Sequence, residues 1–306
     1  MKDEIQLEHI IIEGTNVCNA ACVFCPREKY KHPLQHMSME LFEKIINEAL
    51  EMGIKSVGFA SFGEPLCDPG LVEKIEYIKN KNKEVSIHIT STLFLLNQQL
   101  TSCFIRNVDT IHISFYGMSP EVYEKIHGGT LKFERSRENV LSLISERNKY
   151  HGKTPYIVMR YLVSELNEHQ MEQFIQYWEP IADEVMVWKP HNFLYGREYR
   201  KTNKTADKSC GRPFSNVLYF DIEGRVTTCC FDFNKEMEVG NVGNESIKEI
   251  LKGEKLRELR QRHTEYNYSG ILCENCDQRI TDPEVLVYST ESNRGVREFS
   301  MNRKQF

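Results

Sequence analysis

Three closely spaced cysteines are the residues of this sequence best suited to chemistry. Cys18, Cys22 and Cys25 form a C-x3-C-x2-C pattern in the segment CNAACVFC. An iron-sulfur cube takes four thiolate ligands, so a loop that supplies three leaves one iron open to a small molecule. Structural zinc sites usually combine C-x2-4-C pairs that lie far apart, and disulfide frameworks are typical of short secreted chains. The spacing therefore favours an iron-sulfur cluster at which a reaction takes place.

A second set of cysteines lies toward the C-terminal end, at Cys210, Cys229, Cys273 and Cys276. Four protein thiolates complete the coordination of a cube, so such a cluster can accept or pass electrons or stabilise its domain, but it leaves no iron open to substrate. A zinc ribbon fits this spacing about equally well, because C-x2-C pairs also bind zinc. Cys230 is an additional cysteine directly beside this set.

Composition and charge narrow the class of protein. The chain has 306 residues, of which 40% are hydrophobic, enough for a large core with a smaller appendage or for two domains. Its net charge of -5 gives no support for a nucleic-acid or membrane-surface partner, and the basic cluster at residues 27–32 is expected to be a solvated loop. No apolar run approaches the ~20 residues of a membrane helix, and no signal-peptide pattern is present. Ten cysteines without an export signal predict a reducing, cytoplasmic location.

Apolar runs typical of strands alternate with helical patterns before residue 190. Strands are expected at residues 9–13, 56–60, 85–90, 110–115, 156–163 and 184–188. Residues 39–52 predict a helix with Ser38 as its N-cap, and Asp68 followed by Pro69 predicts the cap and first residue of another. Such β-α units form a parallel sheet.

The chemically interesting segments follow the first four predicted strands; they contain the cysteine loop, Gly63, Glu64, Pro65, Ser91 and Ser114. In parallel barrels the reactive groups lie at the C-terminal ends of the strands, so we expect these segments to meet. His88 and His112 lie within strands, where a histidine satisfied within the fold is the expectation.

The pattern changes after the sixth strand. A polar stretch without periodicity separates it from a cysteine-containing segment, for which the sequence predicts a β-hairpin at residues 217–228 and short helices at residues 246–251 and 254–260. The expected parts are a barrel at residues 1–195, a linker at 196–209, a small domain at 210–280 and a tail at 281–306.

The cysteine loop resembles that of the radical S-adenosylmethionine (SAM) enzymes, and Phe62-Gly63-Glu64-Pro65 resembles their second signature, which holds the methionine amino group. This resemblance implies an α/β fold with a partial (β/α)6 TIM-like barrel. It also implies a 4Fe-4S cluster that binds SAM at its open iron, and hydrogen-atom abstraction by a 5′-deoxyadenosyl radical. The implied SAM contacts are Phe24 near the adenine, Gly63, Glu64, Pro65, Ser91 and Ser114. Ser91-Thr92 departs from the T-N-G-like ending common in the family.

The segment from Cys210 to Cys276 resembles the auxiliary-cluster domain called SPASM or twitch. This resemblance favours iron-sulfur over zinc for the second set, and implies a small α+β domain with a β-hairpin. No cysteine follows Cys276, so the shorter twitch form with one auxiliary 4Fe-4S cluster is expected, ligated by the four cysteines. Within the family, the chain is similar to the dehydrogenases of 2-deoxy-scyllo-inosamine.

These resemblances imply an oxidoreductase that abstracts a hydrogen atom from a small polar substrate, such as a sugar or cyclitol, and oxidises the substrate radical through the auxiliary cluster. Arg197 is the candidate base, with a solvated linker charge as its alternative. The implied electron donor is a flavodoxin or ferredoxin. Three alternatives stay open: a radical epimerase with Cys230 as hydrogen donor, a peptide-modifying enzyme, and a non-catalytic electron carrier. A free cysteine such as Cys230 is also commonly a small buried hydrophobe.

Overall fold

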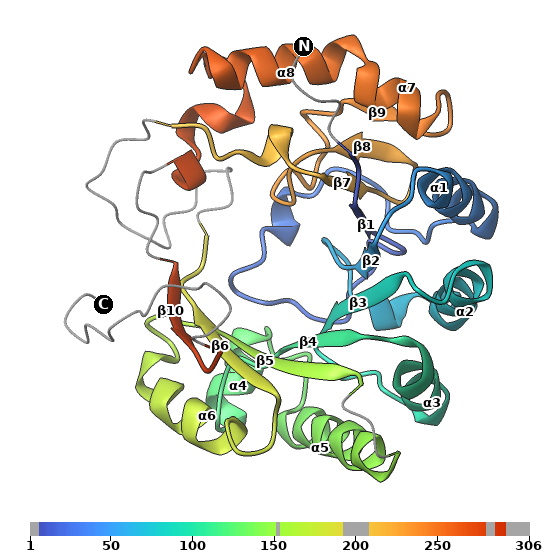
Figure 1. Cartoon of the computed structure of the whole chain (residues 1–306). Coiled ribbons are helices and arrows are strands. Elements are labelled where there is room, and N and C mark those ends of the chain that lie inside the picture. Colours follow the sequence, from blue (N-terminus) through green and yellow to red (C-terminus); the bar gives the residue numbers. More distant parts are fainter. Residues whose placement is uncertain (1–5, 151–153, 192–207, 280–284, 292–306) are drawn as a thin grey trace.

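A single curved sheet organises the chain. A computed structural model describes residues 6–150, 154–191, 208–279 and 285–291. Within these residues one sheet runs in the order β10-β6-β5-β4-β3-β2-β1-β7-β8-β9, and it forms an arc with most helices on its convex side (Figure 1). The strands are β1 (His9–Ile12), β2 (Ser56–Phe59), β3 (Ser86–Ser91), β4 (Thr110–Ser114), β5 (Tyr156–Leu162), β6 (Glu184–Trp188), β7 (Val217–Phe220), β8 (Arg225–Thr227), β9 (Gly240–Asn241) and β10 (Leu286–Ser289). The α-helices are α1 (Met39–Glu51), α2 (Leu71–Lys81), α3 (Gln98–Asn107), α4 (Pro120–Ile126), α5 (Phe133–Lys149), α6 (Met171–Trp178), α7 (Ile247–Lys252) and α8 (Glu254–Thr264).

Strands β1 to β6 form the predicted partial barrel. They pair in parallel and in chain order, each with its neighbour in sequence. Every end lies within one residue of the strand expected from the apolar runs. No helix among the described residues is long and apolar enough to cross a membrane.

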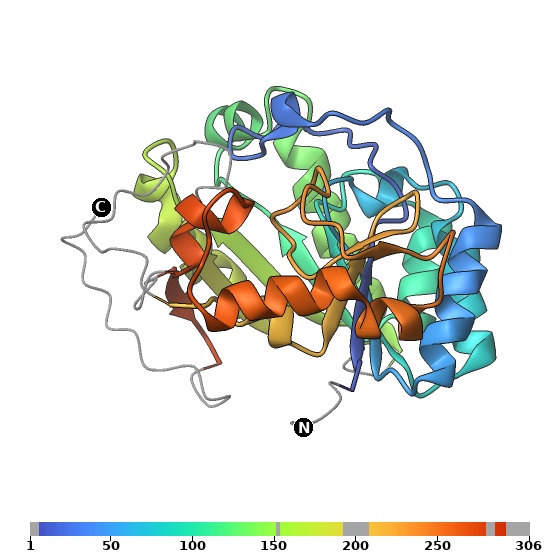
Figure 2. The same ribbon diagram turned by 90° about the horizontal axis from the view of Figure 1, so that it is seen from above.

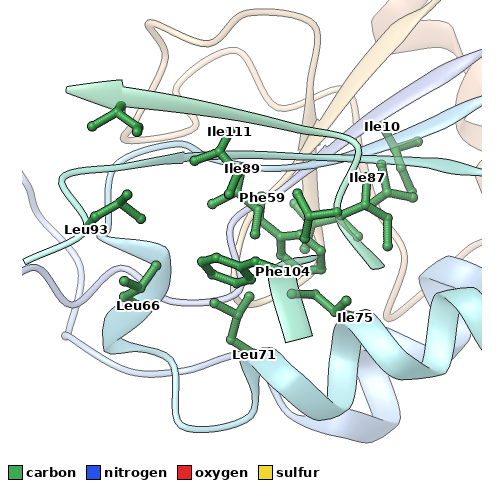
Figure 3. Packing of buried hydrophobic residues seen from close by; sticks show 14 of the residues in the cluster. Ile10, Phe59, Leu66, Leu71, Ile75, Ile87, Ile89, Leu93, Phe104 and Ile111 are labelled. Carbon is green, nitrogen blue, oxygen red and sulfur yellow. The ribbon is translucent and has the colours of Figure 1, made fainter. Parts of the chain in front are cut away.

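Buried apolar residues and half-buried polar residues alternate along the strands, so the two faces of the sheet differ. In β3, Ile87 and Ile89 are 0% exposed, while His88 and Thr90 beside them are half-buried and point the other way. On the helix side, apolar residues of the strands pack against α2 and α3, as Figure 3 shows for Phe59, Ile75 and Phe104. Burial of each such side chain stabilises the fold by about 1.5–3 kcal/mol. The opposite, concave face carries polar residues.

Helix beginnings follow local hydrogen bonding. Ser38 caps α1 as predicted, since its side chain accepts a hydrogen bond from the Leu41 amide at 3.2 Å. The predicted start of α2 is wrong, because the helix begins at Leu71 rather than Pro69. Asp68 Oδ1 instead accepts from the Gly70 amide at 2.9 Å, and its Oδ2 pairs with Lys74 Nζ at 2.6 Å. A buried carboxylate thus turns the chain before the helix starts.

The C-terminal segments extend both ends of the barrel sheet. Strands β7 and β8 form the predicted antiparallel hairpin. This hairpin continues the barrel sheet, since β7 pairs in parallel with β1. Strand β10 lies within the segment expected to be a tail and pairs antiparallel with β6. Helices α7 and α8 lie beside the hairpin end of the sheet (Figures 1 and 2).

Candidate active site

The first three cysteines lie together in the loop that follows β1. The Cys25 amide donates to the Cys22 carbonyl at 3.0 Å, and the Ala20 amide lies 3.4 Å from Cys18 Sγ. Burial raises the pKa of Cys22 well above its ordinary value, and the neighbouring thiols of Cys25 and Cys18 raise it further. Such thiols lose their protons when cationic charge is supplied nearby, and a bound metal centre provides it. The donor set therefore fits an iron-sulfur cluster.

The Gly63-Glu64-Pro65 segment packs directly on this loop. The Glu64 amide donates to the Val17 carbonyl at 2.9 Å. A Cβ added to Gly63 would lie 2.0 Å from the Thr15 carbonyl oxygen, so glycine alone permits this approach. The two sequence signatures are thus adjacent in space.

The Glu64 carboxylate is 5% exposed and is held by the end of β3. Its Oε1 accepts from Ser91 Oγ at 2.5 Å, and its Oε2 accepts from the Thr92 amide and Oγ1 at 3.0 Å each. Burial raises the pKa of Glu64, and these hydrogen bonds lower it. Ser91, expected among the SAM contacts, therefore has its hydroxyl directed to Glu64. The unusual Ser-Thr ending of this strand fixes the carboxylate.

Phe24 and Ser114, two further predicted SAM contacts, meet at Tyr116. Phe24 is 3% exposed and lies edge-on to the Tyr116 ring, with centroids 5.6 Å apart. Ser114 ends β4; burial raises the pKa of Tyr116 to about 12, and the nearby Ser114 opposes that rise. The sequence analysis did not assign Tyr116. Its only signal was an aromatic residue just past a predicted strand.

Arg160 is a half-buried cation that no sequence motif marks. It stands on β5 opposite Ser114 on the concave face. Its Nε is buried and has no hydrogen-bond partner among the described residues. Burial lowers the pKa of Arg160, and the negative groups of Tyr116 and Glu184 oppose that effect. Because a buried guanidinium is costly without an anion, this position suits a carboxylate-bearing ligand. A charged residue within an apolar strand pattern was the available signal.

His112 contradicts the expectation of a satisfied strand histidine. Its Nδ1 is buried and has no partner among the residues that the structure describes. Burial, assisted by the charge of Arg160, lowers the pKa of His112 to about 3, so the ring is neutral. It is paired in register with Thr90 of β3 on the concave face. This face thus offers both donors and acceptors to a polar ligand.

The four cysteines of the second set surround one cavity. Its volume is about 350 Å³, including solvent at its mouth, and it is lined by Cys210, Cys229, Cys273, Cys276, Arg212 and Arg279 among others. Burial raises the pKa of Cys273 to about 12 and that of Cys276 to about 11, and neighbouring thiols contribute. Convergence of four sulfurs with two arginines fits an anionic cluster with complete thiolate coordination.

Cys230 lies outside the lining of this cavity. It is exposed, so it is not the small buried hydrophobe that a free cysteine commonly is. Burial raises the pKa of Tyr219 on β7, and the nearby Cys230 thiol raises it further. Tyr219 alternates with the buried Leu218 and Phe220, which places it on the concave face of the sheet. Cys230 therefore lies near a side chain that faces the interior of the partial barrel.

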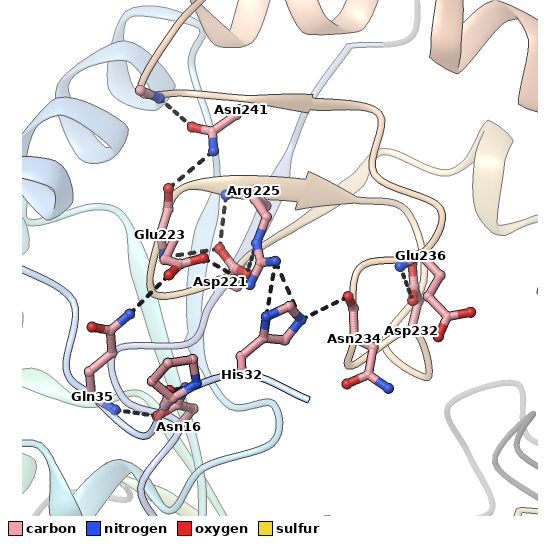
Figure 4. Close-up of polar contacts among 12 residues, drawn as sticks. Asn16, His32, Gln35, Asp221, Glu223, Arg225, Asp232, Asn234, Glu236 and Asn241 are labelled. Carbon is pink, nitrogen blue, oxygen red and sulfur yellow. Dashed lines mark hydrogen bonds and ion pairs between the residues drawn. The ribbon is translucent and has the colours of Figure 1, made fainter. Parts of the chain in front are cut away.

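The segment after the cysteine loop joins the two cluster regions. The Lys31 amide donates to Asn234 Oδ1 at 3.1 Å, and His32 Nε2 lies 3.1 Å from the Asn234 carbonyl (Figure 4). The Phe62 ring stacks on Tyr30 with centroids 4.5 Å apart and on Phe233 with centroids 4.8 Å apart. Lys29 and Lys31 are exposed, as expected for a solvated loop, but Tyr30 and His32 of the same loop bridge the two cluster regions.

The cysteines are arranged differently from the ligands of a single metal ion. Among the described residues, no three His, Cys, Asp or Glu side chains converge as ligands of a single metal ion would. The thiolates of a cube bind separate irons, so they need not converge on one point. Arg197, the candidate base, lies outside the described residues.

Comparisons with known proteins agree with both family resemblances, that of the cysteine loop and that of the C-terminal segment. Residues 12–177 match the radical SAM superfamily, and residues 210–277 match SPASM, an iron-sulfur cluster-binding domain. A probable GTP 3′,8-cyclase of Sulfolobus acidocaldarius is 23% identical over 296 residues, which cover 83% of this chain and 90% of the relative. Several other GTP 3′,8-cyclases match over 41–54% of their own length.

Solved structures show the same fold. BtrN, in complex with AdoMet and 2-DOIA, has a TM-score of 0.60 at 16% identity, covering 89% of this chain and 93% of BtrN. Streptococcus suis SuiB, bound to its precursor peptide SuiA, has a TM-score of 0.64 at 12% identity, covering 90% of this chain and 71% of SuiB. The superfamily match covers more than half of the chain. The protein therefore belongs to the radical SAM superfamily, with SAM and 4Fe-4S clusters, including a SPASM auxiliary cluster, as its cofactors.

Proposed function

We propose that this enzyme oxidises a carbinol carbon of a small polar substrate, such as a sugar or cyclitol, to a carbonyl. The observation that carries the proposal is the single cavity surrounded by Cys210, Cys229, Cys273 and Cys276, because a fully coordinated auxiliary cluster suits electron transfer. The bound cofactors supply hydrogen-atom abstraction by a 5′-deoxyadenosyl radical and a one-electron acceptor. The alcohol thus loses one hydrogen atom to the adenosyl group, one electron to the acceptor and its hydroxyl proton to a base.

The protein's own residues hold the reactants. Cys18, Cys22 and Cys25 are our proposed ligands of the SAM-binding cluster, and the Gly63-Glu64-Pro65 segment beside them would bind the methionine amino group. Arg160 would bind an anionic group of the ligand, and the polar concave face would bind substrate hydroxyls. Arg197 is retained as the proposed base.

The proposed reaction also requires an electron donor, a reducing compartment and a suitable substrate. A low-potential donor such as flavodoxin or ferredoxin would reduce the SAM-binding cluster. Seven of the ten cysteines are proposed cluster ligands that must stay reduced, which supports a reducing compartment such as the cytoplasm. The likeness to BtrN, solved with 2-DOIA, supports a cyclitol-like substrate, while the other relatives make GTP and peptides necessary comparison substrates.

The test is anaerobic turnover of the reduced, cluster-loaded enzyme with SAM. Aminocyclitols and sugars would be compared with GTP and short peptides, and 5′-deoxyadenosine and carbonyl product would be quantified. We expect one carbonyl per deoxyadenosine from a polyol. Cys276→Ser should abolish carbonyl formation while deoxyadenosine still forms. Formation of deoxyadenosine without any carbonyl from the wild-type enzyme, or product from GTP or peptide alone, would refute the proposal, and no deoxyadenosine at all would indicate an electron carrier.

Epimerisation is the second candidate, because Cys230 is exposed and lies near enough to the concave-face residue Tyr219 to raise its pKa. An epimerase returns a thiol hydrogen to the opposite face of the substrate radical. In deuterated water, its product would carry deuterium at the inverted carbon, and Cys230→Ala would stop turnover. The dehydrogenase would incorporate none and would tolerate Cys230→Ala.

A further inference from the structure

The turn between α4 and α5 is built against the first cysteine loop. The Val23 amide donates to the Ile126 carbonyl at 2.9 Å, and the Ala21 amide donates to the His127 carbonyl at 3.4 Å. Gly128 has a φ of +67°, and a Cβ there would lie 2.4 Å from the Ala21 carbonyl oxygen. The backbone of this turn therefore fits the loop so closely that glycine is required at residue 128.

A histidine of this turn reaches one of the three cysteines. His127 Nδ1 lies 3.1 Å from Cys22 Sγ, and the residue is 0% exposed. Its ring stacks on Tyr116 with an interplanar angle of 10°, and it packs on Tyr123 at 4.4 Å between centroids. The two aromatic contacts fix the direction in which Nδ1 points.

The chemistry of the contact assigns the proton. A thiolate that binds iron has no proton of its own, so His127 Nδ1 must be the donor in this hydrogen bond. The other ring nitrogen, Nε2, is buried and has no partner within the described part of the chain, so a proton there would be unsatisfied. Both observations place the single ring proton on Nδ1.

We propose that His127 is a positioning residue that donates an N–H···S hydrogen bond to the Cys22 thiolate and thereby raises the reduction potential of the SAM-binding cluster. Hydrogen bonds to cluster sulfurs are among the factors that set such potentials. Reduction adds negative charge to the cluster, so a donor favours the reduced form. The proposal goes beyond the oxidation proposed above, since it concerns cluster reduction whatever the substrate is.

The test compares His127→Phe with the wild-type enzyme by redox titration monitored by EPR. Phenylalanine keeps a ring between the two tyrosines and removes the donor. The signal that changes on SAM addition identifies the relevant cluster. We expect about tenfold less reduced cluster at a fixed solution potential, which is a shift of 59 mV for one electron. His127→Gln, which retains an N–H donor, should recover part of the shift.

Tyr123→Phe is the matched control, since it alters a ring in contact with His127 without removing the donor. An equal shift in this control, or an unchanged potential in His127→Phe, would overturn the proposal. If His127→Phe does not retain the cluster, wild-type protein labelled with [15N]histidine gives the answer. Pulsed EPR of its reduced SAM-binding cluster should show a coupled histidine nitrogen, and the absence of this coupling would equally overturn the proposal.

Discussion

At the scale of single residues, the concave face is defined by buried polar groups whose partners within the described chain are incomplete. Arg160 Nε and His112 Nδ1 both lack hydrogen-bond partners there. Because unsatisfied buried donors cost free energy, their retention is best explained by a ligand that completes them.

Arg160→Met should therefore weaken SAM binding about tenfold or more, because one charge-assisted hydrogen bond contributes about 1.5–3 kcal/mol. Equilibrium dialysis with the cluster-loaded protein would measure the dissociation constant. Arg160→Lys, which keeps the charge, should lose less. Unchanged affinity in Arg160→Met would assign this cation to the substrate or to structure instead.

The residues that carry sequence signatures could be predicted, and those that support them could not. The first three cysteines are recognisable from their spacing, whereas Glu64 and the role of the second cysteine set are recognisable from resemblance to a family. Tyr116, Arg160 and His127 have no motif, and their roles depend on which strand ends and turns meet in three dimensions. The available hints were weak: a charged residue in an apolar run for Arg160, and an aromatic residue just past a predicted strand for Tyr116.

At the scale of elements, the start of α2 is fixed by a buried ion pair. The side chains of Asp68 and Lys74 are 2% and 3% exposed, and they join the turn after Pro65 to the first helical turn.

Lys74→Met should leave the Asp68 carboxylate without its cation, and the free energy of unfolding should fall by about 3–5 kcal/mol. Chemical denaturation would measure it. The double variant Asp68→Asn with Lys74→Met should recover part of the loss, since asparagine carries no charge and can still accept from the Gly70 amide. No recovery would contradict this account.

Periodicity predicted the six barrel strands because each alternates or clusters apolar residues toward the helices. It failed at α2, where Asp68 and Pro69 have the residue types of a helix start. Here the buried pairing of Asp68 with Lys74, six residues further along the chain, decided the backbone, and the helix propensity of single residues did not.

At the scale of the whole molecule, both cluster regions are connected to one sheet but have separate sets of cysteine ligands. Because the sets are separate, Cys276→Ser should remove about four of roughly eight irons while leaving the SAM-binding cluster in place. Iron analysis and Mössbauer spectra would measure this. Loss of all iron would show that the two clusters depend on each other for assembly.

The join between β1 and β7 predicts that the barrel is not independent. A fragment ending at residue 191 would expose the edge of β1, including the backbone that now bonds residues 216–220. We expect this fragment to self-associate, as measured by light scattering after size-exclusion chromatography. A monomeric fragment with the unfolding free energy of the full chain would contradict the prediction. Sequence patterns show each strand but not which edges meet, so this join could not be predicted.

The pairing of β1 with β7 also has a consequence for biosynthesis. During synthesis, strand β1 receives its second neighbour only after residues 217–220 have also been made. Until then, the loop that carries Cys18 to Cys25 follows a strand that can be hydrogen-bonded on one side only. Delivery of iron and sulfide by the cell's maturation machinery would consequently follow the synthesis of β7.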